Sequence, residues 1–184
     1  MRRTHEDVRS TRSNERVEHW ARECPDRLAI GCAGNWITYA EWHERAQERA
    51  QFLRGDESPV ALVHDVADIV DFAISYVAAH AADRPALVLN PKIPVADLRK
   101  QISFAGAGTV LSTPGKDVAP APEPRSAPLL DRWGDTIAEI SFSSGTTGEP
   151  KGILLSHRAL AWAGVMTSQL AFAGRHAFGV PGSR

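Results

Sequence analysis

The 184-residue sequence has little cysteine and no excess of charge of either sign. Its 2 cysteines, Cys24 and Cys32, are too few for a disulfide-stapled scaffold and fit a reducing compartment. We expect both to be part-buried, inert thiols. Lys and Arg number 21 against 22 Asp and Glu, which leaves a net charge of −1. This balance argues against a dedicated nucleic-acid-binding protein, which carries a basic excess.

Long hydrophobic runs are also missing. The longest apolar stretches, residues 69–82 and 159–173, are too short to cross a bilayer. The N-terminus begins with basic residues but no apolar run follows, which excludes a secretory signal, and Glu6 and Asp7 are unusual for an organelle transit peptide. We therefore expect a cytoplasmic protein without a membrane span.

The central part of the sequence alternates between apolar strands and helices. A capping box, Thr38-x-x-Glu41, marks the start of one helix. Strands without polar alternation, separated by helices, are typical of a largely parallel sheet covered on both faces, so the predicted fold is α/β. The expected helices are 15–23, 38–53, 67–82 and 95–104, and the expected strands are 28–32, 36–38, 59–64, 86–89 and 109–111.

The composition changes at Ser112. Prolines at 114, 120, 122, 124 and 128 are 5 of the 12 in the chain and predict an extended connector. Beyond it the pattern predicts a strand at 136–142, a loop, a strand at 153–155 and a helix at 156–172 with Ser156 as N-cap. The predicted organisation is a polar tail (1–14), an α/β N-terminal subdomain (15–111), a Pro-rich connector (112–130), a strand–loop–strand–helix segment (131–174) and a loose terminus (175–184).

The loop in that last segment, within ISFSSGTTGEPKG at 140–152, suits an anion. Gly145 and Gly148 permit positive φ, so successive backbone N–H groups can point into one concavity. Lys151 adds a positive charge, and hydroxyl groups come from Ser143, Ser144, Thr146 and Thr147. The loop is not a Walker A motif, because its lysine follows a proline and precedes a strand. Taken alone, these residues leave both a phosphate-binding loop and a flexible hairpin turn open.

The ordered string SFSSGTTGEPKGILLSH resembles the phosphate-binding signature of the adenylate-forming superfamily, which includes acyl-CoA synthetases, peptide-synthetase adenylation domains and luciferases. Ser143 stands where Thr is commoner. The similarity extends to ITYAEW at 37–42 and to LNP at 89–91. The resemblance implies that the loop wraps the β- and γ-phosphates of ATP while a carboxylate attacks the α-phosphorus. The implied nucleotide-binding residues are Ser143, Ser144, Gly145, Thr146, Thr147, Gly148 and Lys151.

The resemblance further implies ATP and Mg²⁺ as cofactors, a carboxylic acid as substrate, and CoA or a carrier protein as acyl acceptor. The family's later Tyr-Gly-x-Thr-Glu segment and its C-terminal lysine have no match in the chain. We therefore expect the N-terminal part of such a ligase, contributing the phosphate-binding loop, and we assign no catalytic residue and no metal ligand. The alternatives are a nucleotide-binding module completed by a downstream chain, and an inactive truncated remnant.

Other polar residues have weaker claims to function. His64, Asp65 and Asp68 lie at a strand end, a common place for functional groups in α/β proteins, but a helix cap at Asp65 is the simpler interpretation. Acidic residues and a histidine on one helix face can bind a metal, but a solvated face is the simpler interpretation. These candidates are His64, Asp65 and Asp68 after the strand at 59–64; Glu15, His19 and Glu23 on the first helix; and His157, which suits structural support better than ligand contact.

Overall fold

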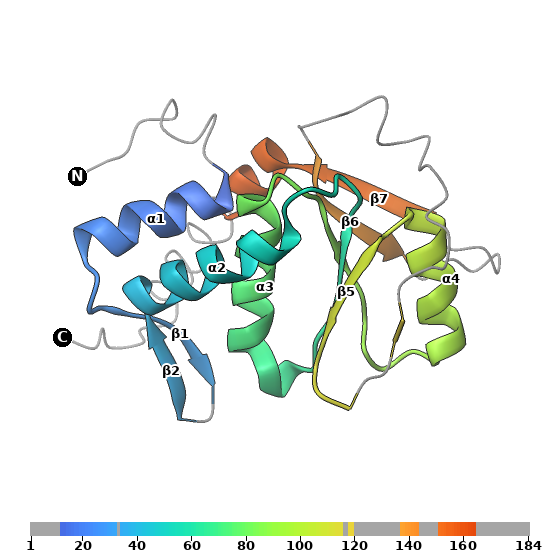
Figure 1. The fold of residues 1–184 in the computed structure, drawn as a ribbon, viewed down its shortest axis with the longest axis horizontal. Coiled ribbons are helices and arrows are strands. Elements are labelled where there is room, and N and C mark those ends of the chain that lie inside the picture. Colours follow the sequence, from blue (N-terminus) through green and yellow to red (C-terminus); the bar gives the residue numbers. More distant parts are fainter. Residues whose placement is uncertain (1–11, 33, 116–117, 120–136, 144–150, 165–184) are drawn as a thin grey trace, which may run out of the picture.

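A five-stranded sheet forms the centre of the fold, in a computed structural model that describes residues 12–32, 34–115, 118–119, 137–143 and 151–164. The helices and strands follow one another along the chain as shown in Figure 1. Their bounds are α1 Ser13–Glu23, β1 Leu28–Cys32, β2 Asn35–Thr38, α2 Tyr39–Leu53, β3 Val60–Val63, the 3₁₀ turn η1 Val66–Asp68, α3 Ile69–Ala81, β4 Ala86–Val88, α4 Val95–Ala105, β5 Thr109–Ser112, β6 Ile137–Ser143 and β7 Lys151–Ser156. Residues 157–164 are helical.

The sheet is largely parallel, as the apolar strands predicted. Its strand order is β5-β3-β4-β6-β7. Strands β5, β3, β4 and β6 run parallel to their neighbours, and β7 returns antiparallel to β6. The chain therefore reaches the sheet edge at β7 through a hairpin, whose connection is the predicted phosphate loop.

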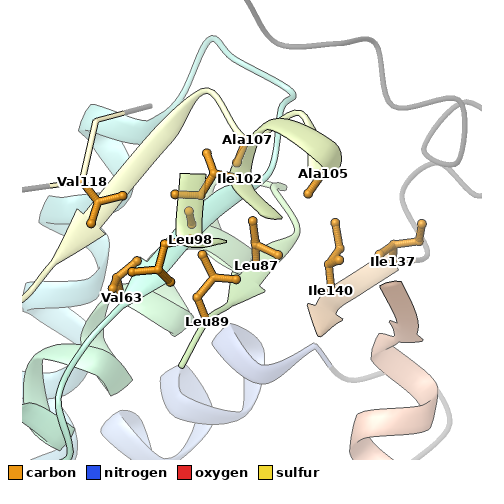
Figure 2. Close-up of a cluster of buried hydrophobic side chains, with 11 residues drawn as sticks. Val63, Leu87, Leu89, Leu98, Ile102, Ala105, Ala107, Val118, Ile137 and Ile140 are labelled. Carbon is orange, nitrogen blue, oxygen red and sulfur yellow. The ribbon is translucent and has the colours of Figure 1, made fainter. Parts of the chain in front are cut away.

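Helices cover both faces of this sheet. On one face, α4 packs Leu98 and Ile102 against side chains of β3, β4 and β6, as Figure 2 shows. On the other face, α2 and α3 cover Val60 and Leu62. All four residues of β3 are buried, which explains why that strand shows no polar alternation.

The N-terminal elements pack on α3. Val17 of α1, Ala46 of α2 and Val77 of α3 form one buried cluster. The antiparallel hairpin β1–β2 presents Ile30 and Ile37 to a second cluster with α3. In the part of the chain that the structure describes, no helix is long and apolar enough to cross a membrane.

Several element boundaries differ from the sequence-based prediction. The first helix begins at Ser13, and the helix expected at 67–82 divides into η1 and α3. The strand expected at 153–155 extends over Lys151–Ser156, because β6 pairs with it along this length. Cys24 is half-buried but Cys32 is exposed, so the prediction of two part-buried thiols was wrong for the residue at the end of β1.

The predicted domain boundaries remain predictions. Most of the polar tail 1–14, the connector from 120 onward and the terminus 175–184 lie outside the described residues. So does the part of the last predicted helix beyond residue 164. At the start of that helix, the Ser156 hydroxyl accepts a hydrogen bond from the Ala159 backbone N–H at 3.1 Å, as expected of an N-cap.

Candidate functional site

The two ends of the predicted phosphate loop lie opposite each other on neighbouring strands. Ser143 ends β6, Lys151 begins β7, and the antiparallel register pairs them directly. Both residues are exposed. Because directly paired residues project from the same face of a sheet, the side chains of Ser143 and Lys151 leave the sheet on the same side. The other predicted site residues, Ser144, Gly145, Thr146, Thr147 and Gly148, lie outside the described residues.

This pair lies at the carboxyl edge of the parallel strands. Since β5, β3, β4 and β6 are parallel, their carboxyl ends meet at one edge, which is where open α/β sheets bind ligands. The same edge carries a hydrogen bond between two connections, from the Asp65 backbone N–H to the Thr113 hydroxyl at 2.9 Å. The fold therefore brings Ser143 and Lys151 to the edge that the α/β topology favours for binding.

A hydrogen bond to Glu139 connects strand β6 to α3. Its carboxylate accepts a hydrogen bond from the Tyr76 hydroxyl at 2.9 Å and another from the Ser141 hydroxyl at 2.7 Å. Burial, together with the negative charge and hydrogen bond of Glu139, raises the pKa of Tyr76. Tyr76 therefore stays a neutral donor, and the contact holds β6 in place three residues before Phe142.

A second contact between α3 and β6 involves two histidines. His80 is buried, and its Nε2 lies 2.9 Å from the carbonyl oxygen of Ala138. Its Nδ1 forms a hydrogen bond with the Ser13 hydroxyl of α1. The ring of His157 packs edge-on against His80, with centroids 4.8 Å apart. His157 thus supports the helix after β7, which agrees with the structural role preferred for it.

The end of β3 carries a buried polar cluster. The side chain of His64 is 1% exposed, and its Nδ1 lies 3.4 Å from Asp71 Oδ2. Neither ring nitrogen has a hydrogen-bond partner within the described residues. Burial lowers the pKa of His64, although Asp71 opposes the shift. Burial alone would raise the pKa of Asp71, but the hydrogen bond and charge of Arg49, 2.7 Å from Asp71 Oδ1, lower it.

The cap assigned to Asp65 was wrong by three positions. Asp68 occupies the N-cap of α3, and its backbone N–H donates to the Asp65 carbonyl at 2.9 Å. Asp65 instead belongs to the tight turn that η1 introduces between β3 and α3. The sequence favoured Asp65 because aspartate is a common N-cap residue.

Residues 17–180 match the family model described as AMP-binding enzyme. The chain belongs to the AMP-binding family. Among curated relatives, it is 29% identical over 165 residues to Surfactin synthase subunit 2 of Bacillus subtilis, covering 78% of this chain and 4% of that protein. It is 30% identical over 170 residues to N-(5-amino-5-carboxypentanoyl)-L-cysteinyl-D-valine synthase of Amycolatopsis lactamdurans, covering 81% of this chain and 4% of that one.

Solved structures show that the fold of this AMP-binding chain is that of adenylate-forming enzymes. The Klebsiella oxytoca NpsA N-terminal subdomain superposes with a TM-score of 0.66 at 22% identity, over 83% of this chain and 44% of that one. The O-succinylbenzoate Coenzyme A synthetase MenE of Bacillus subtilis, solved in complex with AMP, gives 0.61 at 18% identity, over 79% and 42%. The chain therefore corresponds to less than half of either solved structure and to a small share of the curated relatives.

In the described part of this AMP-binding chain, no group of three His, Cys, Asp or Glu side chains is placed to hold a metal ion. Glu15 has a different role: its carboxylate accepts a hydrogen bond from the Arg12 backbone N–H at 3.0 Å, at the start of α1. Within the described residues, Glu15, His19 and Glu23 therefore do not form a metal site.

Sequence reasoning missed the side chains that hold β6 and β7 in place. Tyr76 and His80 are polar residues in an otherwise apolar helical pattern, and this alone could have marked them as residues with a buried partner. Their partners on β6 are 63 and 58 residues away, so the sequence pattern does not reveal them. The ring of Phe104 contacts Phe142, next to the start of the predicted loop, and nothing in the sequence around Phe104 indicates this contact. Its partner Phe142 is 38 residues further along the chain.

Proposed function

We propose that this chain supplies the ATP phosphate-binding part of an adenylate-forming ligase. The observation that supports the proposal most directly is the pairing of Ser143 with Lys151 across β6 and β7, with both side chains exposed at the carboxyl edge of the sheet. A hydroxyl donor beside an ammonium group suits a polyphosphate. The proposed ligands to the β- and γ-phosphates are Ser143, Ser144, Gly145, Thr146, Thr147, Gly148 and Lys151.

The proposed reaction is the activation of a carboxylic acid. The carboxylate oxygen attacks the α-phosphorus of ATP, the bond from that phosphorus to the β-phosphate bridging oxygen breaks, and pyrophosphate leaves with its electron pair. The products are an acyl-adenylate and pyrophosphate. Donors at Ser143 and Lys151 hold the leaving pyrophosphate and offset the charge that develops on it, which is how proteins accelerate phosphoryl-group chemistry.

Mg²⁺ is proposed to arrive with the nucleotide. Its ligands are oxygen atoms, and the phosphates of ATP supply several of them. Bound with the nucleotide, the cation would neutralise phosphate charge, and Lys151 would contribute positive charge from the protein. The Ser143 hydroxyl fits a phosphate oxygen or a water of the hydrated cation equally well.

The substrate is proposed to be a carboxylic acid, and the acyl acceptor CoA or a carrier protein. This follows from membership of the AMP-binding family and from the peptide synthases among its relatives. We also propose that the chain acts in the cytoplasm, where ATP is available and where the two free thiols, one of them exposed, stay reduced.

Thermal unfolding with millimolar Mg-ATP tests the proposal. A ligand that binds only the native state at ten times its Kd adds about 1.4 kcal/mol of stability. For a chain of this size, that is a rise in Tm of roughly 3–6 °C. Without nucleotide, the Lys151→Ala variant should have the Tm of the wild type, because the exposed Lys151 side chain contributes little to folding. With Mg-ATP, the variant should lose most of the rise in Tm, because it lacks the proposed phosphate ligand.

The matched control is Lys100→Ala. Lys100 is an exposed lysine on α4 that pairs with Asp97 of the same helix, at 3.0 Å. This variant should keep the full rise in Tm. A wild-type Tm that does not move with Mg-ATP, or an equal rise in Lys151→Ala, would contradict the proposal.

A further inference from the structure

Two phenylalanine rings meet at the base of the β6–β7 hairpin. Phe142 is the penultimate residue of β6, and Phe104 belongs to the last turn of α4. Their ring centroids are 5.9 Å apart and the ring planes make an angle of 67°, the edge-to-face arrangement that aromatic pairs favour. Residues 38 positions apart in the sequence thus meet beside the strand ends that carry Ser143 and Lys151.

Both rings also lie against Gly152, the residue after Lys151. A Cβ atom built on Gly152 would lie 3.7 Å from Cε1 of Phe142 and 3.9 Å from Cε1 of Phe104, which is ordinary van der Waals contact. Gly152 is the direct cross-strand partner of Phe142. The exposed backbone next to Lys151 therefore has one ring from its partner strand and one ring from α4 close to it on one side.

The core does not require the ring of Phe104. Helix α4 already buries Leu98, Ile102 and Ala105 against the sheet. Phe104 itself is 53% exposed, which is high for a phenylalanine that only fills a core. The contact of Phe104 with Phe142 is therefore separate from the core packing of α4.

We propose that Phe104 is a positioning residue for the nucleotide phosphates. It acts through Gly152: with Phe142 it holds the first residues of β7 against the end of β6. This keeps Lys151 paired with Ser143, so that both side chains stay on the same face of the sheet. The inference rests on the proposed function, since it assigns Phe104 a part in binding ATP without touching the nucleotide.

Titration of Mg-ATP into Phe104→Ala tests the inference. Loss of the aromatic contact should weaken ATP binding about fivefold, the effect of one aromatic pair expressed as affinity. The Phe104→Tyr variant should restore binding close to wild type, because it keeps the ring. Phe52→Ala is the matched control, since Phe52 on α2 is 88% exposed, and it should leave the Kd unchanged.

A double-mutant cycle separates positioning from a general effect on the fold. If Phe104 acts through Lys151, Phe104→Ala should weaken binding in the wild type and have no further effect in a Lys151→Ala background. Equal weakening in both backgrounds, or none in the wild type, would overturn the inference while leaving the proposed function in place. Failure of the wild type itself to bind Mg-ATP would overturn both.

Limited proteolysis gives a readout that needs no nucleotide. Trypsin cleaves after Lys151, and both residues of the Lys151–Gly152 bond are paired with β6 next to the two rings. Phe104→Ala should increase the cleavage rate at this bond, Phe104→Tyr should keep it low, and Phe52→Ala should not change it. An unchanged rate in Phe104→Ala would show that the ring does not hold β7, and the inference would be wrong.

Discussion

His80 shows how a single buried side chain is fixed in one protonation state. The Ala138 carbonyl can only accept a hydrogen bond, so Nε2 of His80 carries the proton and Nδ1 accepts from the Ser13 hydroxyl. The neutral ring therefore has both nitrogen atoms satisfied. Burial lowers the pKa of His80 to about 4, and the nearby His157 and Arg12 act in the same direction.

This shift predicts a loss of stability in mild acid. Between pH 6.5 and 4 the unfolded chain binds a proton at His80 that the folded chain does not, so the free energy of unfolding falls as the pH falls. The full effect is about 3 kcal/mol for this histidine. The lowered pKa values of His64 and His157 act with the same sign. Urea unfolding at a series of pH values between 7 and 4.5 measures the slope.

The variant His80→Gln separates the contribution of His80 to the pH dependence of stability from the contributions of other titrating groups. Glutamine can donate and accept hydrogen bonds but does not titrate, so the dependence of stability on pH should become shallower. His43→Gln, at a half-buried position on α2, is the control and should keep the wild-type slope. Equal slopes for wild type and His80→Gln would contradict the assignment of acid sensitivity to His80.

Replacing Arg84 should lower the stability of the fold strongly. Its buried guanidinium donates to the Ser58 carbonyl at 2.6 Å, the Leu53 carbonyl at 3.0 Å and the Thr109 hydroxyl at 2.9 Å, and it pairs with Asp56 at 3.0 Å. Replacement by methionine removes these hydrogen bonds and the ion pair, and should cost about 3 kcal/mol in urea unfolding.

Arg54→Met is the control for this effect. Arg54 is exposed at the end of α2, and its replacement should change stability by less than about 0.5 kcal/mol. If Arg84→Met were as stable as Arg54→Met, the hydrogen bonds of Arg84 would not hold the α2–β3 connection to β5.

At the scale of elements, local patterns predict helix starts well. The capping box expected at Thr38 is present: the Thr38 hydroxyl accepts from the Glu41 backbone N–H at 3.2 Å, and the Glu41 carboxylate accepts from the Thr38 backbone N–H at 2.7 Å. Both partners lie three residues apart, so the sequence alone contains the whole interaction.

The Thr38→Ala variant tests how much this cap stabilises the chain. Loss of the hydroxyl leaves one N–H of α2 without its partner and should cost about 1 kcal/mol of unfolding free energy. Thr38→Ser keeps the hydroxyl and should stay within a few tenths of wild type. Chemical denaturation measures both, and an equal loss in the two variants would show that the cap hydrogen bond is not what Thr38 contributes.

Element boundaries set by distant contacts could not be predicted. Strand β7 is longer than its apolar pattern because its extra residues, Lys151, Gly152 and Ser156, are paired with β6. The contact of Phe104 with Phe142 and the hydrogen bond of Tyr76 with Glu139 join helices to a strand far along the chain. None of these partners is visible in a window of neighbouring residues, so periodicity carries no information about them.

At the scale of the whole molecule, the fold class was predictable but the strand order was not. Apolar strands alternating with helices indicate a parallel sheet whatever the order of the strands. In the structure β5 lies beside β3, and β6 joins on the far side of β4, next to β7. That order places the hairpin of β6 and β7 at a sheet edge and brings Ser143 and Lys151 to the carboxyl ends of the parallel strands.

The central claim is that Ser143 and Lys151 hold the outer phosphates of ATP, and a comparison of Mg-ATP with AMP tests it most directly. Calorimetric titration of the full chain should show ATP binding at least about tenfold tighter than AMP, because AMP lacks the β- and γ-phosphates that these donors bind. In Lys151→Ala the preference for ATP should largely disappear, while AMP affinity stays unchanged. Equal affinity of the wild type for ATP and AMP, or an undiminished preference in Lys151→Ala, would contradict the account.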